Sequence, residues 1–306
     1  MVCAGCMTFH KSKPLESPPK KSMRITQSEI TADSLPEKGV PEAPEQKEDR
    51  GSRTDGMQKQ SAARSEAEEI QRLLPAVLPL PEYEKLTYNL RWMIFNVGTL
   101  TAEIKGFRLY RGRPVYVLQL HLESNAWLSK IYTIDSTFTS FMDAEHMYTL
   151  REEVDRKEGS YRKHAVVEYN QQEHQASFYN YTDDTAKTFP IPPGVQDGLS
   201  AVYYFRTLPL EVGDTIHYMV VASESVYELY ADVVKKASIS VGPFKDQDAV
   251  FVKPYARQGG EPVKKGTMIG YFSTNPTKIP LTSTIKAPLF TKAAAFLIDV
   301  EYPRNN

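Results

Sequence analysis

The residues with the most distinctive chemistry stand at the start of the chain, where MVCAGCMTFH holds its only cysteines. Cys3 and Cys6 precede His10, and thiolate and imidazole groups bind zinc, but one C-x-x-C pair lacks the second ligand pair of a structural zinc site. Small residues before a cysteine also occur in bacterial lipoprotein signals, with Cys6 as the lipidated residue. We favour this interpretation. A metal or redox site and an incidental pair remain open alternatives.

Two observations bear on the lipoprotein interpretation. The charged and apolar regions of an export signal are missing before Cys6, and Cys3 stands where leucine is usual; a start upstream of Met1 would explain the gap, and the sequence leaves this open. No cysteine follows Met7, so a folded domain beyond it has no thiol to oxidise outside the cytoplasm. The sequence therefore predicts an exported protein held on the membrane by a lipid anchor at Cys6.

Further along the chain, pairs of residues with metal-binding or acid–base chemistry occur without a third partner. His121 with Glu123, and His164 with Glu168, have spacings that put each pair on one face of a strand, yet we interpret both as solvated faces. Asp183-Asp184 is typical of a turn. No nucleophile elbow, phosphate-binding loop or dinucleotide fingerprint occurs. The sequence thus predicts no catalytic residue, no metal and no cofactor.

Tyrosine is the most conspicuous surplus, with 18 residues in the chain. A tyrosine ring has an apolar face and a polar tip, which suits a groove for an acyl chain or a sugar. Tyrosine is also simply a good strand former, and that is the simpler interpretation. If a ligand is bound, the candidate binding residues are Tyr179, Tyr181, Tyr203, Tyr204, Arg206 and Tyr218.

Composition divides the chain. No aromatic residue occurs between His10 and Glu82, and this stretch is rich in Pro, Lys, Glu, Ser and Gln, which predicts disorder. The expected organisation is a remnant of the lipidation signal at 1–10, a disordered tether at 11–66, a short helix and connector at 67–81, and a β domain at 82–306. Ser65 with Glu68 forms a capping box for that helix, and Pro75 ends it.

The net charge of −1 predicts no nucleic-acid partner, because such proteins carry a basic face or stripe. No apolar run approaches the ~18 residues of a transmembrane helix, so none is predicted.

Beyond Tyr83 the sequence alternates with the period of strands. Leu86, Tyr88, Leu90, Trp92 and Ile94 are predicted to share one face, and Asn96–Gly98 is expected to form the following turn. Further strands are predicted at Lys130–Thr139, Met147–Val154, Tyr161–Tyr169, Ala176–Tyr181, Thr215–Ala222, Val226–Val234, Ala237–Val241, Ala249–Tyr255, Met268–Ser273 and Ala293–Tyr302. The fold class predicted is all-β and mainly antiparallel, a curved sheet forming an open or closed barrel, with one short inserted helix.

The inserted helix is predicted in VQDGLSAVYYFRTLPLEVGD. Asp197 is a good N-cap, and Leu199, Val202, Tyr203 and Arg206 form one stripe on the helix. We expect this helix to plug one mouth of the barrel and complete its core, with a ligand-facing lid as the alternative.

Three stretches together resemble the bacterial family known as domain of unknown function 3108: YNLRWMIFNVGTLTAEIKG, QDGLSAVYYFRTLPLEVGD and GYFSTNPTKIPL. The resemblance covers roughly Tyr83 to Tyr302 and implies an exported, β-rich envelope domain without an assigned reaction. Asn275 stands in the third stretch where an aspartate is expected.

These observations favour a non-enzymatic envelope protein on the periplasmic face of the outer membrane. It is expected to bind a lipid, glycolipid or other amphipathic ligand. A hydrolase acting on envelope polysaccharide and a purely structural protein-interaction domain are the alternatives. The sequence does not identify a protein partner.

Overall fold

The computed structural model describes residues 53–222, 224–263, 267–286 and 292–302. Cys6 and most of the predicted tether lie outside these residues. The chain divides into two compact units, and the β domain belongs to the one that includes residues 64–306. Within the described residues, neither helix is long and apolar enough to cross a membrane.

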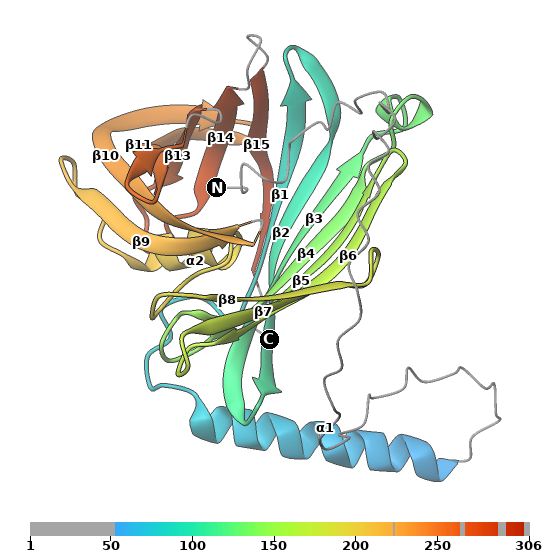
Figure 1. Cartoon of the computed structure of the whole chain (residues 1–306). Helices are drawn as coiled ribbons and strands as arrows, with labels where there is room; N and C mark the ends of the chain where they lie inside the picture. The colour runs from blue at the N-terminus through green and yellow to red at the C-terminus, as the bar shows by residue number, and fades with distance from the viewer. Residues whose placement is uncertain (1–52, 223, 264–266, 287–291, 303–306) are drawn as a thin grey trace, which may run out of the picture. The chain divides into compact units, whose positions relative to one another are not determined.

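The β domain is built almost entirely from antiparallel strands, with α2 inserted between β8 and β9 (Figure 1). The elements are α1 (Arg53–Leu73), β1 (Tyr83–Trp92), β2 (Phe95–Tyr110), β3 (Arg113–Ser124), the 3-10 helix η1 (Leu128–Lys130), β4 (Asp135–Asp143), β5 (Thr149–Glu158), β6 (Tyr161–Asn170), β7 (Gln175–Asn180), β8 (Thr185–Pro190), α2 (Ser200–Thr207), β9 (Thr215–Ala222), β10 (Ser225–Val241), β11 (Phe244–Gln258), β12 (Glu261–Pro262), β13 (Thr267–Ser273), β14 (Pro280–Lys286) and β15 (Lys292–Glu301).

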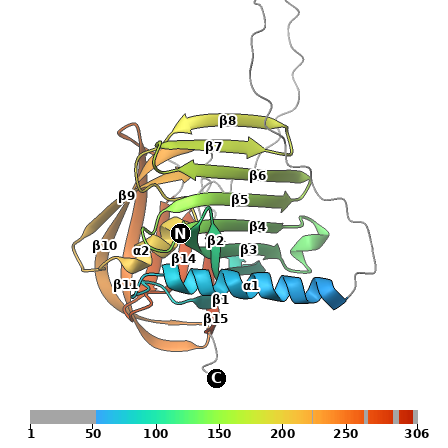
Figure 2. The ribbon, with the colours of Figure 1, turned by 90° about the horizontal axis from the view of Figure 1, so that it is seen from below.

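All strands belong to one 15-stranded sheet in the order β8-β7-β6-β5-β4-β3-β2-β1-β15-β14-β13-β11-β10-β9, with β12 beside β11. Figure 2 shows β3 to β8 stacked as one wall and β9 to β11 as a second wall beside them. Strands β8 and β9 end the sheet and do not pair with each other. The predicted all-β fold is therefore confirmed as an open, strongly curved sheet.

Curvature brings the two walls together around one core. Leu120 on β3 and Phe138 on β4 share a buried cluster with Val241 on β10 and Ala249 on β11. In β1 the burial alternates up to Leu90, as the period-2 pattern predicts, whereas Trp92 and Ile94, predicted on the same inward face, are exposed. The inward faces of the walls are therefore the apolar faces that the sequence predicts.

A short segment after β8 bridges the gap between the walls. The N–H of Gln196 donates to Met219 O at 3.0 Å, and the N–H of Val221 donates to Gln196 O at 2.8 Å, forming a parallel bridge to β9. On the other side, the N–H of Thr149 donates to Val195 O at 3.4 Å. This seam ties β9 to the beginning of β5 without closing the barrel.

Helix α2 begins directly after the seam. Asp197 accepts hydrogen bonds from the N–H groups of Leu199 at 2.7 Å and Ser200 at 2.9 Å, so its side chain caps the helix as predicted. The helix ends at Thr207, and Pro209 follows two residues later, where it cannot continue the helix.

The predicted turn at Asn96–Gly98 is wrong. The chain turns at Met93–Ile94, and Asn96–Gly98 lies within β2. Gly98 is small for another reason, since a Cβ there would lie 2.0 Å from the carbonyl oxygen of Glu123. The turn was misplaced because Met93 and Ile94 carry no turn signal.

Other element boundaries also differ from the prediction. Helix α1 begins at Arg53, so Ser65 lies inside it rather than at its start, and part of the predicted tether is helical. Strand β4 begins at Asp135 rather than Lys130, and β8 and β14 were not predicted.

Candidate functional site

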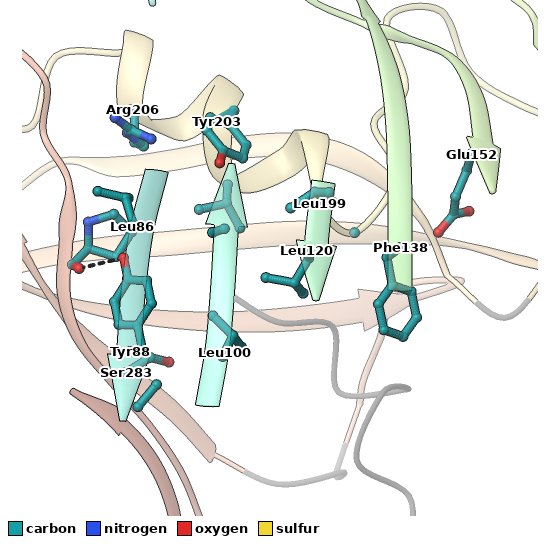
Figure 3. A pocket seen from close by; sticks show the side chains of 15 residues that line it. Leu86, Tyr88, Leu100, Leu120, Phe138, Glu152, Leu199, Tyr203, Arg206 and Ser283 are labelled. Atoms are coloured by element: carbon teal, nitrogen blue, oxygen red, sulfur yellow. Dashed lines mark hydrogen bonds between the residues drawn. The ribbon is translucent and has the colours of Figure 1, made fainter. Parts of the chain in front are cut away.

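A cavity of about 80 Å³ lies between α2 and the concave face of the sheet (Figure 3). It is mostly apolar. The residues that line it are Leu86, Tyr88, Leu100, Ala102, Leu120, Phe138, Glu152, Gly198, Leu199, Val202, Tyr203, Arg206, Pro280, Ser283 and Ala295. An engineered apolar cavity of about 150 Å³ binds benzene, so this one has room for part of an apolar chain or for a few waters.

The floor of the cavity comes from alternate residues of neighbouring strands. Ala102 on β2 lies between its Cα partners Leu86 on β1 and Leu120 on β3. Its single methyl group leaves space that a larger side chain would fill. The cavity therefore follows from one small residue in a row of leucines.

The roof is the stripe of α2 that the sequence predicts, formed by Leu199, Val202, Tyr203 and Arg206. Tyr203 is buried at 2% exposure, and its hydroxyl has no hydrogen-bond partner among the described residues. Burial raises the pKa of Tyr203, so the hydroxyl keeps its proton and remains a donor. Leaving such a group unpaired costs about 1–3 kcal/mol. A polar atom inside the cavity would recover that cost.

Glu152 enters the cavity wall from β5, on the far side from Arg206 (Figure 3). Burial, and then the charge of Asp197, raise the pKa of Glu152 to about 8, against the opposing effects of a hydrogen bond from Tyr169 and the charge of Lys163. Tyr169 Oη donates to Glu152 Oε2 at 3.2 Å. At neutral pH Glu152 is therefore mainly a neutral carboxylic acid, able to donate one hydrogen bond and accept others.

Arg206 is held by a buried ion pair and is not free to meet a ligand. Its Nη1 and Nη2 each donate to a carboxylate oxygen of Glu84 at 2.7 Å, and its Nε donates to Thr277 O at 3.0 Å. Both side chains are almost fully buried. The guanidinium also lies 5.1 Å from the ring centre of Tyr203. Arg206 thus anchors α2 to β1 and supports the ring of Tyr203.

The remaining buried acid near α2 is fully engaged. Asp197 Oδ2 accepts hydrogen bonds from the hydroxyl groups of Ser140 and Thr149, while Oδ1 caps the helix. Asp197 therefore positions α2 over β4 and β5. Among the described residues that line the cavity, Glu152 alone carries a carboxyl group, so no facing pair of carboxylates of the kind glycosidases use is formed there.

The structure separates the six residues proposed from sequence as ligand contacts. Tyr203 and Arg206 line the cavity. Tyr218 is buried behind α2, where its hydroxyl donates to Ala201 O at 2.9 Å and its ring meets that of Tyr204 edge-on. The two remaining tyrosines, Tyr179 and Tyr181, are exposed at the end of β7. The tyrosines do not form one groove.

Sequence reasoning missed Glu84 and Glu152, although a signal for both exists. Glu84 is in phase with Leu86 and Tyr88, and Glu152 is in phase with Leu150 and Val154. An acid at an inward position of an alternating strand needs a partner or a proton. Here one acid has Arg206 and the other keeps a proton.

The histidine and asparagine positions singled out in the sequence have structural roles. His121 Nε2 lies 3.0 Å from Asp135 Oδ1, and His164 packs its ring on Tyr181. Asn275 Oδ1 accepts hydrogen bonds from Ser273 Oγ at 2.7 Å and from the N–H of Lys278 at 3.0 Å, which fixes the β13–β14 turn. In the part of the chain that is described, no three His, Cys, Asp or Glu residues form a metal-binding group.

The family of proteins of unknown function DUF3108 matches residues 87–289, which span most of the sheet and α2. The chain belongs to this family. The resemblance seen in the three sequence stretches is thereby confirmed. No curated protein matches the sequence.

A solved structure of another family has an architecture similar to that of this DUF3108 domain. The β-barrel-like protein of the DUF1849 family from Brucella abortus matches with a TM-score of 0.50 at 10% identity, over 74% of this chain and 100% of that chain. A protein from Parabacteroides distasonis described as a candidate lipoprotein matches with a TM-score of 0.29 at 8% identity, over 74% and 100%. The first likeness supports a β-barrel-like fold.

Proposed function

We propose that this DUF3108 domain is an exported binding protein for an amphipathic molecule of the lipid or glycolipid class. An apolar part of the ligand occupies the cavity under α2. A polar atom next to that part accepts a hydrogen bond from Tyr203 Oη or pairs with Glu152. The protein performs no chemistry on the ligand.

The observation that carries the proposal is the unpaired hydroxyl of Tyr203 above an apolar cavity. Most buried polar groups in folded proteins are paired, so an unpaired hydroxyl at an apolar cavity is a position where a polar ligand atom can bind. A second cavity of about 20 Å³ shares Val202, Pro280 and Ser283 with the first. A longer apolar chain extends from one cavity to the other when these shared side chains shift.

The polar groups around the cavity favour an uncharged head group. Glu152 is neutral at pH 7, and the charge of Arg206 is already matched by Glu84. A hydroxyl, ester or amide group can both donate and accept at this site. A free carboxylate or amine would find no opposite charge among these groups.

The proposed location is the periplasmic face of the outer membrane, with a lipid anchor at Cys6. The support is the small-residue sequence before Cys6 and the absence of other cysteines after it. Mass spectrometry of the chain expressed behind a lipoprotein export signal is expected to show acylation that Cys6→Ala abolishes. An unmodified wild-type chain would contradict the anchor and leave the cavity proposal untouched.

Mass spectrometry of bound small molecules tests the ligand. The full chain is purified gently after export, and its organic extract is compared with that of Ala102→Leu, which fills the cavity floor, and Ala186→Leu, which adds the same atoms to an exposed position of β8. We expect a stoichiometric lipid or glycolipid in wild type and Ala186→Leu, and its loss in Ala102→Leu.

Thermal unfolding of the same variants separates loss of ligand from loss of fold. Ala102→Leu is expected to stay folded, because its added atoms enter existing space. A wild-type extract without ligand, or equal ligand in all variants, would contradict the cavity as the binding site.

A further inference from the structure

Exposed apolar side chains gather at one end of the β domain, at the tips of the strands. The β1–β2 hairpin and the loop between β3 and β4 end there, at the top of Figure 1. We define the apolar rim as the six exposed residues at these tips: Trp92, Met93, Ile94, Phe95, Trp127 and Ile131. Ile94 is 84% exposed and Ile131 is 77% exposed. The chain's only two tryptophans are both in this rim.

The two tips form one continuous surface. The rings of Phe95 and Trp127 stack with centres 6.0 Å apart. Asn125 joins the backbones, since its Nδ2 donates to Asn96 O at 2.7 Å and its N–H donates to Val97 O at 2.9 Å. These hydrogen bonds fix the position of the two tips relative to each other, so the rim is an ordered surface.

The opposite turns of the same strands show what an ordinary solvated end looks like. Arg111 and Gly112 turn between β2 and β3, Glu145 and His146 between β4 and β5, and Gln172 to His174 between β6 and β7. The exposed side chains in these turns are polar. The apolar character of the rim is thus a property of one end and not of the sheet as a whole.

The β1–β2 turn also departs from what hairpin geometry favours. Met93 has a φ of 56°, in the left-handed region where Gly or Asn is ordinarily found. Ile94, its neighbour, is β-branched and almost fully exposed. Folding alone gives no reason to place two large apolar residues in a tight turn at the tip of a hairpin.

Cations flank the rim. Arg91 and Lys292 lie at its base on β1 and β15, and Lys130 lies between Trp127 and Ile131; all three are exposed. The acidic residues on the adjoining strand ends are Glu123, Asp135 and Glu158; Asp135 is paired with His121 and Glu158 with Arg156. Tryptophan between apolar and cationic groups is the composition of proteins that sit in the interface of an anionic bilayer.

We propose that the apolar rim docks the β domain on a bilayer surface that contains anionic phospholipid. The tryptophan rings lie at the level of the head groups, Ile94 and Ile131 enter the acyl boundary, and the three cations face the lipid phosphates. The observations favour a bilayer over a protein partner because the apolar residues project from hairpin tips and form no groove.

Tryptophan fluorescence tests the proposal directly, since both fluorophores are in the rim. The full 306-residue chain carries Cys6→Ala to exclude acylation, and vesicles contain phosphatidylcholine with or without phosphatidylglycerol. We expect a shift of emission to shorter wavelength, quenching by brominated lipid, and stronger co-sedimentation with the phosphatidylglycerol vesicles that added salt weakens.

A double variant and a matched control make the test specific. Ile94→Ser/Ile131→Ser keeps both tryptophans and is expected to lower vesicle partitioning by about tenfold or more, because two exposed apolar side chains are removed. Val212→Ser, at an exposed site after α2, is expected to partition like wild type. Far-UV circular dichroism checks that each variant is folded.

Three results would overturn the proposal. They are a wild-type chain that leaves vesicles unbound with unshifted emission, a double variant that partitions like wild type, and a loss of binding in Val212→Ser equal to that of the double variant. Concentration-dependent self-association that the double variant removes, without vesicle binding, would instead make the rim a protein interface.

Discussion

The polar side chains around the cavity differ in how their charges and hydrogen-bonding groups are satisfied. Glu84 and Arg206 neutralise each other, and Asp197 is satisfied by backbone and hydroxyl donors. Glu152 keeps its proton, and the hydroxyl of Tyr203 stays open. Of these five groups, Glu152 and Tyr203 have hydrogen-bonding capacity left for a ligand.

Glu152 is expected to make the stability of the fold depend on pH. Its pKa is about 8 in the folded chain and near its ordinary value of 4.5 when unfolded. Between these values the folded state holds a proton that the unfolded state has released, so the free energy of unfolding falls as pH rises through this window. At about 1.4 kcal/mol per pKa unit, the upper limit of the effect is roughly 5 kcal/mol, less after solvent screening.

Urea unfolding of wild type and Glu152→Gln at pH 5, 7 and 9 measures this effect. Glutamine does not titrate, so Glu152→Gln is expected to gain stability relative to wild type as pH rises. Glu173→Gln, in an exposed turn, is the control and should follow wild type. A constant difference between wild type and Glu152→Gln across this range would contradict a proton on Glu152.

Removing one residue of the Glu84–Arg206 ion pair is expected to destabilise the fold more than removing both. Arg206→Met leaves the buried carboxylate of Glu84 without a partner and should lower the free energy of unfolding by about 3–5 kcal/mol. The double variant Glu84→Leu/Arg206→Met removes both charges and should recover most of that loss. Urea unfolding followed by circular dichroism measures both. If the double variant has a lower free energy of unfolding than Arg206→Met, the ion pair itself is strongly stabilising.

At the scale of elements, the β1–β2 hairpin has a turn that its own residues do not favour. Met93 adopts a positive φ, and neither Met93 nor Ile94 is a turn former. The hairpin forms because its strands are held on both sides, by β15 and β3. Folding of the hairpin therefore does not explain why Met93 and Ile94 occupy the turn.

Met93→Gly is expected to raise the free energy of unfolding by about 1 kcal/mol, because glycine adopts a positive φ without steric cost. The same change removes one apolar side chain from the rim and should weaken vesicle partitioning. Thermal unfolding and co-sedimentation measure the two effects. Gly112→Ala, at a positive φ in the opposite polar turn, should destabilise the fold and leave partitioning unchanged. A stability gain with unchanged partitioning would place Met93 outside the docking surface.

The elements that sequence could predict are those whose apolar period is regular. Strands β1 and β3 alternate over most of their length, and the stripe on α2 predicts its cavity-facing side. Strand β8 is almost entirely exposed and polar, so it gives no pattern. Strand β10 was expected as two strands, because Lys235 and Lys236 interrupt its pattern where the pairing with β11 shifts register. The cavity was not predictable, since it depends on which residues from distant strands face each other.

At the scale of the molecule, the seam through Gln196 links the β9 edge to the opposite wall. Among the described residues, it supplies the only backbone hydrogen bonds between them. Gln196 is buried, and its Nε2 donates to Met147 O at 2.7 Å. Gln196→Leu removes this bond and should lower the free energy of unfolding by about 1–3 kcal/mol.

Hydrogen exchange locates the consequence of that change. The N–H of Val221, which donates to Gln196 O, is expected to exchange faster in Gln196→Leu, while amides in β3 and β4 keep their protection. Gln172→Leu, in an exposed turn, is the control. Uniformly faster exchange across the sheet would mean that the seam supports the whole fold rather than the β9 edge.

The open edge at β8 has a consequence for how the protein behaves at high concentration. An unpaired strand is a template for another chain, and extended sheets of this kind grow into fibrils unless the edge is blocked. Strand β8 ends in Pro190, which has no N–H to donate, and Pro192 and Pro193 follow at once. Lys187 adds a charge in the middle of the strand. The barrel can therefore stay open along one side without recruiting copies of itself edge to edge.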